Sequence, residues 1–94
     1  MDKNSKERTY GRMYGHTFSM LRKEKYKKLE DVYEWASTDK DAKEIFDSSE
    51  DVAYFWYAAR DAFNDYSDQV AKGVKPEYNK PITKLFRVRY GEIS

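Results

Sequence analysis

The sequence predicts a mainly helical, single-domain bundle built around one long central helix. Three observations carry this prediction. A chain of 94 residues has the size of one domain. Its aromatic content of 17% is too high for a disordered chain. The apolar residues between 50 and 72 recur every three or four positions, as on one face of a helix. Residues 1–94 are therefore expected to form one domain, with residues 1–8 flexible.

The central helix is predicted over residues 50–72. Ser48 or Ser49 is suited to cap its first turn. Gly73, with Pro76 beyond it, is typical of a helix end. The side chains expected to face the core are Val52, Phe55, Trp56, Ala59, Phe63, Tyr66 and Val70.

Two shorter helices are predicted upstream of the central one, both packing on its Phe55, Trp56 and Phe63 side. The first runs from about residue 26 to residue 36, with Trp35 on its flank and an inward stripe of Leu29, Val32, Tyr33 and Ala36. The second spans residues 39–47 and follows a capping-box-like sequence, Thr38-Asp39-Lys40-Asp41. Its apolar residues are Ala42, Ile45 and Phe46.

The N-terminal region leaves helix and strand as alternatives. A helix is expected from about Thr17 to Lys28, whereas residues 5–16 fit either a helical face or a strict strand alternation. Gly11 and Gly15 each disfavour a helix interior by about 1 kcal/mol relative to Ala.

The C-terminal region, residues 82–93, is equally open. Ile82, Leu85 and Phe86 would face inward on a helix, and Phe86, Val88 and Tyr90 would alternate on a strand. If both ends of the chain are extended, they are expected to pair as a minor two-stranded β element.

Charge is distributed unevenly along the chain. Residues 1–28 carry a net charge of +6, residues 29–72 a net charge of −8, and residues 73–94 a net charge of +3. Such asymmetry indicates how a protein associates rather than how it folds. Either the basic ends fold back over the acidic middle, or copies of the chain associate as a homo-oligomer.

Residue types that support catalysis are scarce. The absence of Cys excludes disulfides, thiolate metal sites and cysteine nucleophiles. His16 is the only histidine and has no acidic or imidazole companion nearby in sequence, so a solvent-exposed or structural histidine is expected. No phosphate-binding loop or hydrolase motif occurs. We therefore expect no enzymatic activity, cofactor or metal.

The chain has none of the sequence features of a membrane protein. Its first residues lack an apolar signal region, and no apolar run approaches the roughly 18 residues of a spanning helix. A cytoplasmic protein is expected.

The candidate partner-binding residues lie on the central helix, opposite its apolar stripe. They are Tyr54, Tyr57, Asp61, Asp65 and Asp68. Their spacing predicts exposure to solvent, and tyrosine is enriched in interfaces. Such an acidic and aromatic face would fit a basic groove on another protein. The alternative is that the basic N-terminal segment covers this face within the same domain.

A second set of residues suits nucleic acid. Arginines pair with phosphates and tyrosines stack on bases, which makes these residues candidates: Arg8, Tyr10, Arg12, Tyr14, Arg87 and Arg89. No established nucleic-acid-binding motif accompanies them.

The sequence therefore predicts a non-catalytic interaction protein that binds and inhibits a larger protein. Its composition, rich in Tyr and Lys and without Cys, is similar to that of many small bacteriophage proteins. A viral origin would make the partner a host factor and the location the host cytoplasm. A small nucleic-acid-binding regulator is the alternative.

Overall fold

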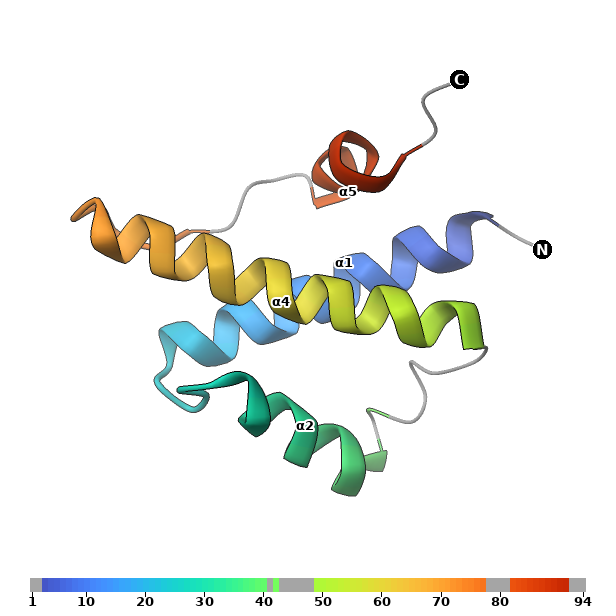
Figure 1. Cartoon of the computed structure of the whole chain (residues 1–94), viewed down its shortest axis with the longest axis horizontal. Coiled ribbons are helices and arrows are strands. Elements are labelled where there is room, and N and C mark those ends of the chain that lie inside the picture. The colour runs from blue at the N-terminus through green and yellow to red at the C-terminus, as the bar shows by residue number, and fades with distance from the viewer. Residues whose placement is uncertain (1–2, 41, 43–48, 78–81, 92–94) are drawn as a thin grey trace.

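Four helices make up the described part of the chain (Figure 1). The structure is a computed structural model and describes residues 3–40, 42, 49–77 and 82–91. The helices are α1 (Lys3–Arg22), α2 (Leu29–Thr38), α4 (Ser49–Ala71) and α5 (Ile82–Tyr90). No strand occurs among these residues, so the predicted β element from the two ends of the chain is wrong.

The two longest helices, α1 and α4, pack against each other and run in the same direction (Figure 1). Tyr10 is hydrogen-bonded to Asp61 and Tyr14 to Asp65, and each pair is separated by 51 residues. Such a constant separation is the mark of a parallel pair. Helix α2 runs back along one side of the pair, and α5 lies on the other side (Figure 1). The molecule is flat, with extents of 41 × 36 × 15 Å.

The core lies between α1 and α4. Small side chains on α4, namely Ala58, Ala59 and Ala62, are fully buried and let α1 approach closely. The large side chains that fill the interface are Tyr10, Met13, Tyr14, Phe18 and Phe55.

Helix α4 confirms the central helix of the sequence prediction. Its C-terminus has a left-handed Gly73 (φ 75°), and the amide of Val74 donates to the carbonyl of Gln69 at 3.1 Å. Ser49 is the first residue of the helix, and Ser48 lies outside the described residues. Val52 and Val70 are exposed, which corrects the two ends of the predicted inward stripe.

Helix α1 answers the open question at the N-terminus, because residues 3–22 are helical throughout. The strand alternative is wrong. The helix stops at Arg22, short of the predicted end at Lys28, because Glu24 adopts a left-handed conformation (φ 61°) that turns the chain. Gly11 and Gly15 lie against Ile82 of α5, so they mark the packing surface for that helix.

Helix α2 begins at Leu29 and ends at Thr38, slightly later than predicted at both ends. The Asp31 carboxylate accepts hydrogen bonds from the backbone amides of Lys27 (2.6 Å) and Lys28 (3.1 Å), which lower its pKa and fix the first turn. Of the helix predicted over residues 39–47, the structure describes only residues 39, 40 and 42. Ala42 among them is buried.

Helix α5 shows that the helical alternative is correct for residues 82–90 and that the strand alternative is wrong. Phe86 is buried, and Ile82 and Leu85 are half-buried, as the helical pattern requires. No helix among the described residues is long and apolar enough to cross a membrane.

His16 connects α1 to α2 and to the segment that precedes α2. Its ring stacks on Trp35 with a centroid distance of 4.2 Å, and its Nε2 is hydrogen-bonded to the Tyr26 hydroxyl at 2.9 Å. Burial raises the pKa of Tyr26 to about 12, so the phenol stays protonated. Of the two alternatives for His16, these contacts favour the structural one.

Mild acid is expected to destabilise the fold through His16. Burial lowers the pKa of His16 below its usual value of 6.5, with the Asp39 charge opposing and the Lys23 charge reinforcing the shift. The unfolded chain therefore binds a proton more readily, and stability falls as pH drops below about 6.5. Urea unfolding between pH 7.5 and pH 5 measures this loss. His16→Gln keeps a polar group but does not titrate, so equal pH slopes for variant and wild type would contradict the expectation.

Candidate functional site

The acidic face of α4 is covered in its middle and exposed only at its ends. Asp61 is 8% exposed and Asp65 is half-buried, so the predicted exposure is wrong for Asp61. Asp68 is exposed and pairs with Lys72 at 3.1 Å. Tyr57 is 36% exposed and Tyr54 half-buried.

Asp61 is the centre of a polar network that joins three helices. Its Oδ2 accepts hydrogen bonds from the hydroxyls of Tyr10 on α1 and Tyr90 on α5, both at 2.7 Å. Nη1 of Arg89 lies 3.4 Å from the same oxygen. The carboxylate therefore accepts from two phenols, one fully buried on α1 and one half-buried on α5.

Asp65 repeats the arrangement one turn along α4. It accepts a hydrogen bond from the Tyr14 hydroxyl, and its Oδ1 accepts one from Nη2 of Arg89 at 3.0 Å. Burial, strengthened by the Asp carboxylates, raises the pKa of both Tyr10 and Tyr14, so both phenols are held as donors. Arg89 bridges the two carboxylates, and the network fixes α5 on the α1–α4 pair.

The tyrosines of the predicted face also pack on α5. Tyr57 stacks on Tyr90 with a centroid distance of 5.4 Å, and Tyr54 meets Phe86 at 5.7 Å. A cation lies over each ring, Lys6 over Tyr54 at 5.6 Å and Arg60 over Tyr57 at 5.4 Å. The alternative of a face covered within the domain thus holds for its middle: Tyr10 and Tyr14 of the N-terminal segment cover it together with Arg89 and Tyr90 of α5.

The predicted nucleic-acid set is divided by the fold. Tyr10 and Tyr14 are fully buried, and Arg89 is ion-paired, so these three are not available for stacking or phosphate contact. Burial follows from the hydrogen bonds of both phenols to α4. Arg8 and Arg12 are exposed on α1. Arg87 is exposed on α5, where it lies 3.7 Å from Glu7.

An apolar hollow between α2 and α4 was not anticipated from the sequence. It has a volume of about 310 Å³ and is lined by Leu29, Glu30, Tyr33 and Trp56. Leu29 is 42% exposed and Tyr33 64% exposed, which corrects their predicted inward positions. Tyr33 meets Trp56 edge to face at a centroid distance of 5.3 Å.

The sequence held one signal for this hollow. With Trp35 included, the apolar face of α2 is too wide for a single neighbouring helix to cover. Val32 and Ala36 face the core, and Trp35 stacks on Phe55 beside them, with parallel rings 6.2 Å apart. That orientation turns Leu29 and Tyr33 outward.

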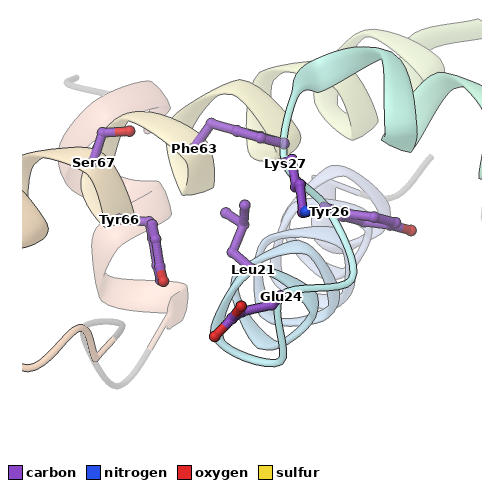
Figure 2. Close-up of a pocket in the computed structure, with 7 residues that line it drawn as sticks. All are labelled: Leu21, Glu24, Tyr26, Lys27, Phe63, Tyr66 and Ser67. Atoms are coloured by element: carbon purple, nitrogen blue, oxygen red, sulfur yellow. The ribbon is translucent and has the colours of Figure 1, made fainter.

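A second hollow, of about 290 Å³, lies where α1 ends beside α4 (Figure 2). Leu21, Phe63 and Tyr66 form its apolar part, and the charged side chains of Glu24 and Lys27 lie at its edge. The left-handed backbone of Glu24 places this carboxylate there. The edge of this hollow therefore carries one negative and one positive side chain.

The described residues contain no group of three or more His, Asp or Glu side chains that could hold a metal ion. Searches against protein-family models, curated proteins and solved structures give no match, so the function is argued from the geometry alone.

Proposed function

We propose that this chain is a non-catalytic protein that binds a larger protein and inhibits it by occupying part of its surface. The observation that carries the proposal is the hollow between α2 and α4, with Tyr33 64% exposed beside Trp56. Tyrosine and tryptophan dominate the binding energy of protein interfaces. Of the residues first considered for the contact, Tyr57 and Asp68 are still accessible.

The Tyr33 side chain is not needed for the stability of the fold. Val32 and Ala36 already bury the inner face of α2, so the Tyr33 ring adds little to the core. A stiff aromatic side chain loses little conformational entropy when a partner covers it.

Nucleic-acid binding is the second candidate. It is favoured by Arg8 and Arg12 on α1 and by Arg87 on the neighbouring α5, all exposed. Their guanidinium groups would contact phosphates, without the stacking partners that Tyr10 and Tyr14 would have supplied.

The test is a capture experiment with tagged wild type and two variants. Tyr33→Ser removes the exposed ring, and Val88→Ser is the matched control, since Val88 is 74% exposed on α5. A partner is first identified from bacterial lysate with and without nuclease, and its dissociation constant is then measured with purified proteins. We expect Tyr33→Ser to weaken binding about 30-fold, the effect of an interface hot spot, and Val88→Ser to leave it unchanged.

Circular dichroism checks that both variants keep their helices. Unchanged affinity in a folded Tyr33→Ser variant would refute the proposal. Loss of all captured material on nuclease treatment would favour the nucleic-acid candidate and the arginines of α1 and α5.

A further inference from the structure

The hollow between α2 and α4 carries negative charge as well as apolar surface. Glu30 lines it, and Glu34 follows one turn later on the same exposed side of α2. Among the residues that the structure describes, neither has an ion-pair partner. Asp31, by comparison, is engaged with the backbone at the start of the helix.

The aromatic pair of the hollow also lacks a cation that other rings of the molecule have. Lys6 lies over Tyr54 and Arg60 over Tyr57, but no cation of the described chain lies over Tyr33 or Trp56. The faces of aromatic rings attract cations, and tryptophan does so most strongly. The hollow therefore combines an electron-rich aromatic pair with the Glu30 carboxylate, and Glu34 lies one turn further along α2.

The charge of α2 strengthens this preference. Leu29–Thr38 contains three carboxylates and no basic residue. Lys27 and Lys28 precede the helix and lie outside it. The helix itself is thus uniformly acidic, and its charge favours a cation over an anion beside Tyr33.

We propose that the hollow receives an arginine side chain from a basic segment of the partner protein, an inference that rests on the proposed function. The aliphatic part of the arginine packs on Leu29, its guanidinium stacks on the Tyr33–Trp56 pair, and its N–H groups donate to Glu30 or Glu34. Arginine fits better than lysine because its planar group both stacks on rings and pairs with a carboxylate through two hydrogen bonds. The volume of about 310 Å³ is suited to one such side chain.

The first test uses N-acetyl-arginine amide as the probe and N-acetyl-citrulline amide, its neutral counterpart of similar shape, as the control. NMR follows the indole N–H signals of Trp56 and Trp35, assigned with Trp56→Phe. We expect a saturable shift of the Trp56 signal with a dissociation constant in the millimolar range. This corresponds to a binding free energy on the order of −3 to −4 kcal/mol. Citrulline amide should leave the signal in place.

A double variant, Glu30→Gln with Glu34→Gln, is expected to weaken the arginine probe about tenfold. Glu77→Gln, an exposed carboxylate outside the hollow, is the matched control and should bind as wild type does. No shift of Trp56 at about 50 mM probe, where a millimolar site would be saturated, would overturn the inference. An equal shift with citrulline amide would do the same.

The partner capture experiment separates the two proposals. If Tyr33→Ser loses the partner and the double glutamine variant keeps it, the hollow is the docking site but its occupant is not cationic. If both variants keep the partner with wild-type affinity, the proposed function fails together with the inference. If the double variant also loses most of its affinity, both are supported.

Discussion

Replacing Asp61 by alanine is expected to lower the free energy of unfolding by about 3–5 kcal/mol, the range for removing one partner of a buried ion pair. The buried hydroxyl of Tyr10 and the half-buried hydroxyl of Tyr90 lose their common acceptor. Arg89 loses one of the two carboxylates that it bridges. A domain of this size has only about 5–15 kcal/mol of stability in total, so the variant should be close to unfolding at 37 °C.

Urea unfolding followed by far-UV circular dichroism measures this loss. Asp61→Asn keeps an acceptor oxygen but not the charge, so it should lie between alanine and wild type. Asp68→Ala is the matched control on the same helix, and its exposed pair with Lys72 is worth at most about 1 kcal/mol. Equal losses for Asp61→Ala and Asp68→Ala would show that the network does not stabilise the fold.

Phe55→Ala is the second substitution with a large expected effect, a loss of about 3–5 kcal/mol. Phe55 is fully buried and contacts Trp35 of α2 and Trp56 of α4, with ring centroids 6.2 and 5.0 Å away. The cavity left by the ring would loosen α2 in particular, because few other large side chains hold it to α4.

Two signals distinguish this outcome from general weakening. The near-UV circular dichroism of Trp35 and Trp56 should fall together with the unfolding midpoint. Val88→Ala, at a residue that is 74% exposed, should leave the near-UV signal unchanged and alter the free energy of unfolding by no more than about 0.5 kcal/mol. If Phe55→Ala behaves like Val88→Ala, the contact between α2 and α4 is looser than its geometry implies.

Local pattern was sufficient to predict α4 because its apolar spacing, its first-turn serine and its terminal glycine all agree. It was insufficient for α1. Gly11 and Gly15 weaken the helical signal, and what compensates for them is the contact of this face with α5, far away in sequence. The end of α1 at Arg22 was also missed, since a left-handed glutamate at position 24 is not a residue type that marks helix ends.

The candidate site was predicted only in part, because the contacts that cover it also come from residues distant in sequence. Periodicity correctly placed Asp61 and Asp65 opposite the apolar stripe of α4, and the inference of solvent exposure assumed that only apolar faces are covered. Here a polar face is covered through hydrogen bonds. Tyr10 and Tyr14 are one turn apart, as Asp61 and Asp65 are, so each hydroxyl meets one carboxylate. Two tyrosines and two aspartates at the same spacing were the available signal.

The parallel arrangement of α1 and α4 has a consequence for how the chain reaches its fold. Consecutive helices of an up-and-down bundle meet soon after each is formed, but Tyr10 meets Asp61 only across 51 residues. Rates of folding fall as contacting residues lie farther apart in sequence. During synthesis, the tyrosine-rich face of α1 must wait for most of α4 before it is covered. The nascent chain therefore carries an exposed aromatic surface for longer than a bundle with local connections would.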